Sequence, residues 1–184
     1  PMNTVLIDSF GREINYARLS VTDRCDFRCV YCMAEKMTFV PKKDVLSLEE
    51  LYQTAVALIA SGIRKIRLTG GEPLIRNDIM WLIKKISQLE GLEELTLTTN
   101  GSQLVKYAEQ LKACGVRRIN ISLDTLDADK FQTITRTGKL QPVLDGIDAA
   151  IDAGFESIKL NSVILKNRND DEIIPLINFA KKYG

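Results

Sequence analysis

The chain has 184 residues, of which 45% are hydrophobic and 27% are charged, and its 25 basic and 24 acidic residues leave a net charge of +1. This balance is typical of one soluble globular domain and gives no basis for a nucleic-acid or membrane partner. No apolar run approaches the roughly 18 to 20 residues of a membrane span, and no secretory signal is visible. The four cysteines lack a disulfide-like distribution, so we expect a reducing compartment and a cytoplasmic protein.

Residues 1–15 are predicted to form a leader whose apolar side chains could cover one end of a core, namely Val5, Leu6, Ile7 and Phe10. Residues 16–184 are predicted to form one domain of alternating strands and helices. Apolar and polar residues alternate, as in strands, at 16–22, 65–69, 94–100, 118–124 and 157–164. Helical periodicity is expected after Ser47, where Glu50 completes a capping box. It is expected again around 79–86, at 104–111, at 127–153 with a break at 138–142, and from 169 onwards.

The alternation within the strands predicts the shape of the sheet. Strands joined through helices imply right-handed crossovers and a parallel sheet. In such a sheet, strands buried on both faces are continuously apolar, whereas these strands have one polar face. The helices need the apolar face, so the polar face should line the inside of a curved sheet. We therefore predict an α/β fold, a partial TIM-type (βα) barrel truncated after about five units. An open antiparallel sheet would show the same alternation, but the intervening helices argue against it.

Three cations lie on the predicted inner face, namely Arg18, Arg67 and Lys159. Like charges in a lumen repel each other and lose hydration, which is costly without an anionic partner. The sequence therefore indicates a substrate such as a polyphosphate or a carboxylate.

Three cysteines follow the first predicted strand with the spacing C-x3-C-x2-C, at Cys25, Cys29 and Cys32, and the chain has no histidine. Closed structural zinc sites use four ligands, and neither a second cysteine pair nor a histidine is present. Three thiolates suit a metal centre with one open position, so we favour an iron–sulfur cluster over zinc or structural cysteines. The remaining Cys114 is expected to be a small core residue.

The segment Gly70-Gly71-Glu72-Pro73 follows the second predicted strand. Chemistry in α/β barrels sits at the carboxyl ends of the strands, so this segment should lie beside the cysteines. Its glycines permit a close backbone approach, and Glu72 could accept hydrogen bonds from an ammonium group. Taken alone, a tight turn explains the segment equally well.

The motif C-x3-C-x-aromatic-C, with Tyr31 at the aromatic position, resembles that of the radical S-adenosylmethionine (SAM) superfamily. Gly-Gly-Glu-Pro resembles the superfamily segment that binds the amine of SAM. The resemblance implies a [4Fe-4S] cluster with SAM on its fourth iron. It implies cluster ligands at Cys25, Cys29 and Cys32, and SAM contacts at Tyr31, Gly71, Glu72 and Ser122.

Longer phrases at 18–23, 67–76, 98–101, 121–124 and 159–163 resemble the amino-terminal portion of the GTP 3′,8-cyclase family of molybdenum cofactor biosynthesis. That resemblance implies reductive SAM cleavage to a 5′-deoxyadenosyl radical, hydrogen abstraction at C3′ of GTP and cyclisation onto guanine C8. It implies GTP contacts at Arg18, Arg67, Thr98 and Lys159.

The GTP 3′,8-cyclase family also has a second [4Fe-4S] cluster held by a carboxyl-terminal cysteine triad, which this sequence lacks. We expect that cluster to come from a region beyond residue 184, and we expect the 184-residue chain alone not to complete cyclisation. The resemblance further implies an electron donor such as flavodoxin or ferredoxin, and it leaves a homodimer open. Two alternatives remain, a radical SAM enzyme for another anionic substrate and a non-catalytic fragment that binds SAM or nucleotide.

Overall fold

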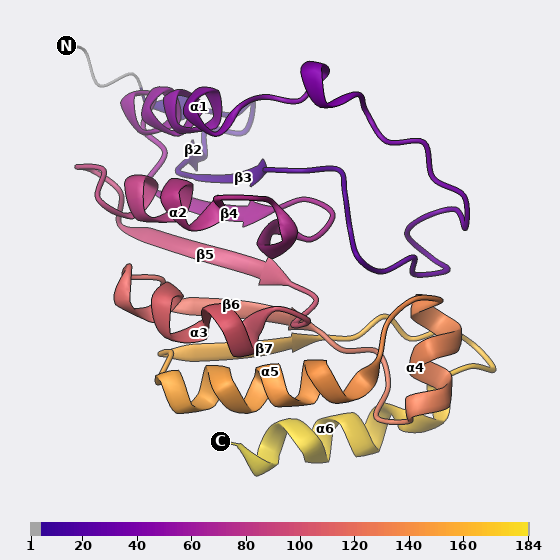
Figure 1. Cartoon of the computed structure of the whole chain (residues 1–184). Coiled ribbons are helices and arrows are strands. Elements are labelled where there is room, and N and C mark those ends of the chain that lie inside the picture. Colours follow the sequence, from indigo (N-terminus) through magenta and orange to yellow (C-terminus); the bar gives the residue numbers. More distant parts are fainter. Residues whose placement is uncertain (1–4, 184) are drawn as a thin grey trace.

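Five parallel strands form the framework of the computed structural model, which describes residues 5–183 (Figure 1). They lie in the sheet in chain order as β3 (Tyr16–Ser20), β4 (Lys65–Thr69), β5 (Glu94–Thr99), β6 (Arg118–Ser122) and β7 (Ser157–Asn161). All neighbouring pairs are parallel, and β3 and β7 form the two edges. The predicted α/β class and partial barrel are therefore confirmed.

Helices connect the strands and follow the last one. They are α1 (Leu48–Ala60), α2 (Ile79–Ser87), α3 (Leu104–Ala113), α4 (Ala128–Thr135), α5 (Leu140–Ala153) and α6 (Ile173–Lys182), with short 3-10 helices η1 (Lys42–Asp44), η2 (Pro73–Ile75) and η3 (Asp170–Glu172). The predicted capping box is present, since Ser47 Oγ accepts from Glu50 N at 3.1 Å and Ser47 N donates to Glu50 Oε2 at 2.7 Å. In the described part of the chain, no helix is long and apolar enough to cross a membrane.

The break in the long predicted helix lies slightly earlier than expected, between α4 and α5 at 136–139. Pro142 belongs to the first turn of α5, where its missing amide N–H costs no intrahelical hydrogen bond. The proline therefore marks the beginning of α5 rather than part of the break.

The core lies between the apolar face of the sheet and the helices. Ile66, Leu97 and Ile119 from the strands pack in one cluster with Leu82 and Ile86 from α2, and none of these five side chains is more than 1% exposed. Fully burying an aliphatic side chain of this size contributes roughly 1.5 to 3 kcal/mol. This burial holds the helices on one face and leaves the other face of each strand to its polar residues.

The leader forms a small hairpin instead of covering the core. Strand β1 (Leu6–Ile7) pairs antiparallel with β2 (Glu13–Ile14), and Asp8 Oδ1 accepts from the backbone N–H groups of Phe10 and Arg12. Ile7 is 63% exposed and Phe10 is 81% exposed, so the expected covering role is wrong for the described residues. The local turn around Asp8 folds the segment onto itself, so its side chains do not reach the core.

The arrows of β3 to β7 all point towards one end of the molecule, where the long connection between β3 and α1 and helix α4 gather (Figure 1). The cysteines lie in that long connection, and the Gly-Gly-Glu-Pro segment follows β4 at the same end. The topology therefore brings the two motifs together.

Candidate active site at the carboxyl end of the sheet

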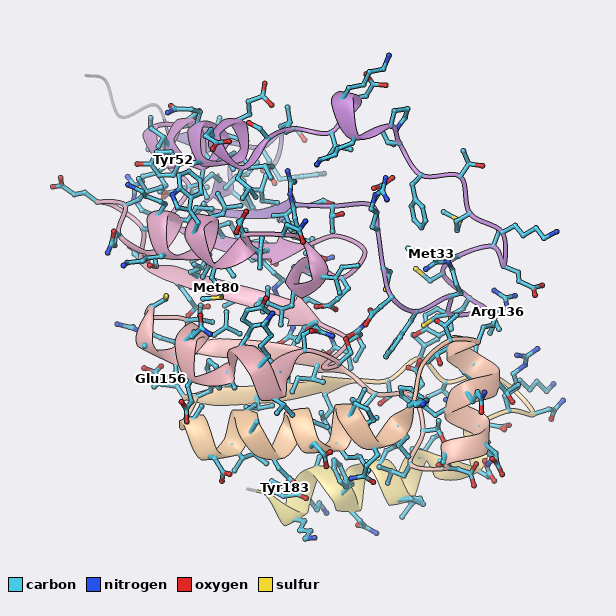
Figure 2. All side chains as sticks on the ribbon, viewed as in Figure 1. Met33, Tyr52, Met80, Arg136, Glu156 and Tyr183 are labelled. Carbon is cyan, nitrogen blue, oxygen red and sulfur yellow. The ribbon has the colours of Figure 1, made fainter. Side chains whose placement is uncertain are left out.

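The cysteine loop, residues 22–33, is fixed to the carboxyl end of α4. The backbone N–H groups of Arg28 and Val30 donate to the carbonyls of Thr135 and Ile134 at 2.8 and 2.9 Å. Carbonyls in the last turn of a helix have no partner within the helix, so the loop satisfies two of them. The Arg136 guanidinium also donates to the carbonyls of Arg28 and Met33. Figure 2 shows the labelled Arg136 and Met33 near each other, beside α4. Sequence reasoning missed this attachment.

The three cysteines differ in exposure. Cys25 and Cys29 are half-buried against the core, whereas Cys32 is exposed. Burial raises the pKa of the Cys25 thiol to about 11 and that of the Cys29 thiol to about 12. Iron must therefore displace protons on binding, because the thiolate is the ligand. The Cys25 sulfur already receives donors of the kind that a thiolate needs, from Phe27 N at 3.4 Å and Asn100 Nδ2 at 3.8 Å.

The three thiols of the loop form a donor set of the kind that holds an iron–sulfur cluster. Soft thiol ligands on one loop, with hydrogen-bond donors directed at sulfur, are typical of such clusters.

Tyr31, a predicted SAM contact, joins the cysteine loop to the far side of the sheet. Its hydroxyl donates to Asp124 Oδ2 at 2.6 Å, and Asp124 Oδ1 accepts from Val163 N at 2.8 Å. Asp124 is only 5% exposed, and burial raises the pKa of its carboxyl and of the Tyr31 hydroxyl. Asp124 had no predicted role. An ionisable residue just beyond a parallel strand was the available signal.

The Gly-Gly-Glu-Pro segment packs directly on the chain that leads into the cysteine loop. Gly71 N donates to Thr22 O and Glu72 N donates to Arg24 O, both at 2.8 Å. A methyl group on Gly71 would lie 2.6 Å from the carbonyl carbon of Arg24. The glycine thus permits a close backbone approach, here between two loops.

Glu72 is buried and already bound by the protein. It is 1% exposed, and its carboxylate accepts from Leu74 N at 3.1 Å, Thr99 Oγ1 at 2.7 Å and Asn100 N at 2.6 Å. These bonds tie η2 to the end of β5. Its expected contact with the SAM amine stays a prediction, and the geometry adds a structural role.

Burial raises the pKa of Glu72 from its usual value near 4.5 to about 7. A raised pKa favours the protonated acid in the folded state, so its stabilising contribution is complete below about pH 4.5 and is lost as the pH approaches 7. We expect the free energy of unfolding of the wild type, minus that of Glu72→Gln, to fall by on the order of 3 kcal/mol over this range. Urea unfolding at several pH values measures this difference. A constant difference would show that the three donors offset the cost of burying the charge.

The residues predicted to contact GTP share one face of the sheet. Arg18 lies opposite Arg67 in the pairing of β3 with β4, and Thr98 and Lys159 both lie opposite Asn120. Ser122, the remaining predicted SAM contact, lies opposite Asn161 at the carboxyl end of β6.

The cations on this face are not neutralised by acidic side chains. Arg67 is half-buried, with Nε 3.4 Å from Thr96 Oγ1 and its guanidinium 5.8 Å from the Tyr16 ring centroid. Arg18 and Lys159 are exposed. Within residues 5–183, none of the three has a carboxylate oxygen within 4.0 Å. The face can therefore attract an anion.

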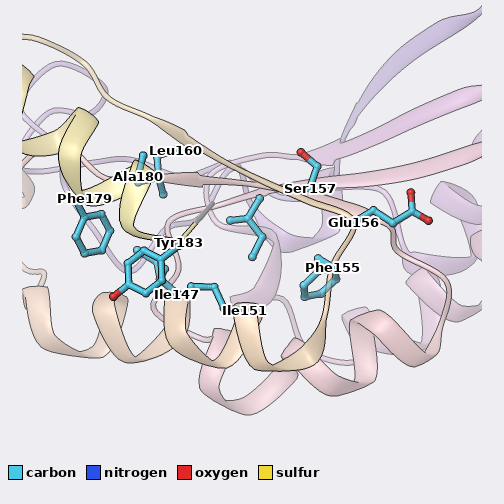
Figure 3. A pocket seen from close by; sticks show the side chains of 10 residues that line it. Ile147, Ile151, Phe155, Glu156, Ser157, Leu160, Phe179, Ala180 and Tyr183 are labelled. Atoms are coloured by element: carbon cyan, nitrogen blue, oxygen red, sulfur yellow. The ribbon is translucent and has the colours of Figure 1, made fainter.

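A cavity lies outside this region, away from the carboxyl end of the sheet. It is a cavity of about 300 Å³ between α5, α6 and the amino end of β7, lined mainly by apolar side chains such as Ile151, Phe155 and Phe179 (Figure 3). Its lining includes none of the cysteines and none of Arg18, Arg67 and Lys159. The candidate site is therefore the cysteine loop together with the polar face of the sheet.

The model of the radical SAM superfamily matches residues 19–180. The chain belongs to the radical SAM superfamily. A [4Fe-4S] cluster and SAM are the cofactors of this superfamily, so the cofactor prediction is confirmed at that level, while the individual contact residues stay predictions.

Two relatives extend the comparison. The chain is 62% identical over 179 residues to the GTP 3′,8-cyclase of Marinobacter nauticus, which covers 97% of this chain and 54% of that protein. It is 62% identical over 181 residues to the GTP 3′,8-cyclase of Rhizobium etli, covering 97% of this chain and 52% of the relative. The chain thus spans about half the length of the curated relatives it matches.

A solved structure shares the fold of this chain. Streptococcus suis SuiB bound to the precursor peptide SuiA aligns with a TM-score of 0.76 at 20% identity. The alignment covers 92% of this chain and 37% of that chain. At this identity the likeness concerns the fold alone.

Proposed function

We propose that these residues form the SAM-cleaving part of a GTP 3′,8-cyclase, which catalyses the first step of molybdenum cofactor biosynthesis. The observation that carries the proposal is the row of cations on the polar face, beside a cysteine loop of the radical SAM type. A triphosphate supplies the negative charge that this face requires. The identity to relatives named GTP 3′,8-cyclase supports the same substrate.

The proposal gives each predicted residue a role. Cys25, Cys29 and Cys32 would hold the cluster, and Tyr31, Gly71, Glu72 and Ser122 would lie at the SAM site. When bound and reduced by an external one-electron donor, the cluster would supply the electron that cleaves SAM to methionine and a 5′-deoxyadenosyl radical. The C3′ hydrogen of GTP would pass to 5′-deoxyadenosine, C3′ would join guanine C8, and one further electron and a proton would complete the product. Arg18, Arg67 and Lys159 would bind phosphate oxygens, and the Thr98 hydroxyl would hydrogen-bond the nucleotide. These contacts would hold the ribose near the cysteine loop.

A SAM-cleavage assay tests the radical chemistry. The protein is reconstituted anaerobically with iron and sulfide and reduced with dithionite, and 5′-deoxyadenosine is quantified with and without GTP. Cys29→Ala should abolish both the cluster absorbance and the product. Cys114→Ala is the matched control, because this half-buried cysteine lies outside the loop and should leave both unchanged. Wild-type product formation by Cys29→Ala would end the radical SAM proposal.

The substrate assignment makes a separate prediction. Lys159→Ala should weaken GTP binding about tenfold or more, because a hydrogen bond to a charged group contributes about 1.5 to 3 kcal/mol and 1.4 kcal/mol is tenfold. Lys166→Ala removes an exposed lysine beyond β7 and should not change the dissociation constant. Isothermal titration with GTP measures both. Equal effects would indicate non-specific attraction, and no effect of Lys159→Ala would favour a different anionic substrate.

A further inference from the structure

Asn100 connects the three segments that build the site. It follows β5, and its backbone N–H donates to Glu72 Oε2 at 2.6 Å. Its side-chain Nδ2 lies 2.7 Å from Asp26 Oδ1 and 3.8 Å from the Cys25 sulfur. Its side-chain Oδ1 accepts from Ser102 N at 2.9 Å. Neither Asn100 nor Asp26 has a role in the proposed function.

The orientation of the Asn100 amide follows from its partners. Ser102 N can only donate, so it must face Oδ1, which turns the two N–H bonds of Nδ2 towards Asp26 and Cys25. Asp26 is held from its other oxygen as well, because Ser102 Oγ donates to Oδ2 at 2.6 Å. The amide therefore has donors directed at both a carboxylate and a sulfur.

This arrangement places one amide between two groups that are themselves in contact, since Cys25 Sγ lies 3.8 Å from Asp26 Oδ1. Asp26 is adjacent to Cys25, and once Cys25 is a cluster ligand both groups carry negative charge. The Asn100 amide donates to each, which stabilises the pair and holds the sulfur in place. Hydrogen bonds to cluster sulfurs are among the features that set the reduction potential, because added negative charge on sulfur is stabilised by a donor.

We propose that Asn100 is a positioning residue that fixes Cys25 as a cluster ligand and raises the reduction potential of the cluster through an N–H···S hydrogen bond. The proposal rests on the cluster assignment of the proposed function. The negative charge of Asp26 lowers the reduction potential of the cluster. The hydrogen bond from the Asn100 amide to Asp26 weakens this lowering.

The test is the midpoint potential of the reconstituted protein, followed by absorbance and electron paramagnetic resonance during a redox titration. Asn100→Asp keeps the size and the Oδ1 acceptor but removes both side-chain donors. At a fixed solution potential, its oxidised-to-reduced ratio should rise about tenfold, which is about 59 mV for one electron. Ser102→Ala, which loses the bond to Asp26 but leaves the Asn100–Cys25 contact, should keep the wild-type potential.

A second variant protects the test against misfolding. Asn100→Ala adds no charge and should shift the potential in the same direction by a smaller amount, whereas Asp26→Asn should shift it upwards. Wild-type potentials in both Asn100 variants would overturn the proposal. So would variants whose metal-free chains have already lost their cooperative unfolding, since Asn100 would then serve the fold alone. Failure of the underlying cluster assignment is recognised separately, by wild-type behaviour of Cys29→Ala.

Discussion

Gly71→Ala is expected to lower the free energy of unfolding by about 3 kcal/mol and to prevent assembly of the cluster. A Cβ atom there would lie 2.6 Å from the Arg24 carbonyl carbon and 3.0 Å from Asp23 O, distances that a backbone contact cannot accommodate. The loop cannot simply move away, because Gly71 N and Glu72 N bond the same stretch of chain. Displacing it would move the entrance to the cysteine loop. Urea unfolding and iron content after reconstitution measure the two effects.

The control for this prediction is Gly154→Ala. Gly154 has a φ of +78° and no atom within 4 Å of a built Cβ, so alanine there meets strain but no clash. The left-handed conformation costs about 1 to 2 kcal/mol, and the cluster should assemble normally. If Gly71→Ala were no more destabilising than this control, the two loops would be less tightly joined than their hydrogen bonds indicate.

Asp124→Ala is the second substitution with a large expected effect. It removes the acceptor of the Tyr31 hydroxyl and of Val163 N, two part-buried hydrogen bonds whose loss costs about 1 to 3 kcal/mol each, the more the less water reaches the group. We expect a loss of about 3 kcal/mol in the free energy of unfolding. The cysteine loop should also lose protection from hydrogen exchange, because the bond from Tyr31 anchors it to β6. Hydrogen-exchange mass spectrometry on the metal-free protein reports this loss.

Tyr31→Phe separates the two parts of that effect. It removes the donor but leaves Asp124 bonded to Val163 N, so we expect a loss of about 1 kcal/mol. The double variant should lose less stability than the sum of the losses in the two single variants, because both substitutions remove the same hydrogen bond. Additive losses would mean that the bond between Tyr31 and Asp124 contributes little to holding the loop.

The sequence alone determined the strands, the helices and the polar face of the sheet. These features follow from local periodicity, since alternate residues of a strand face opposite sides whatever the rest of the chain does. The pattern around Arg18, Arg67 and Lys159 is therefore enough to identify one shared face of the sheet. Parallel order then required the cysteines and Gly-Gly-Glu-Pro to meet at one end.

Only the tertiary structure decided how the site is held. The bonds of Arg28 to Thr135, Tyr31 to Asp124 and Asn100 to Asp26 join residues that are 74 to 107 positions apart, and no local pattern encodes such partners. The same is true of the burial of Glu72, which depends on donors from β5 and its following turn. The exposed leader shows the converse, because an apolar segment was expected to cover a core that its own turn keeps it from reaching. Local periodicity thus identified which residues belong to the candidate site, and long-range hydrogen bonds determined how those residues are arranged in space.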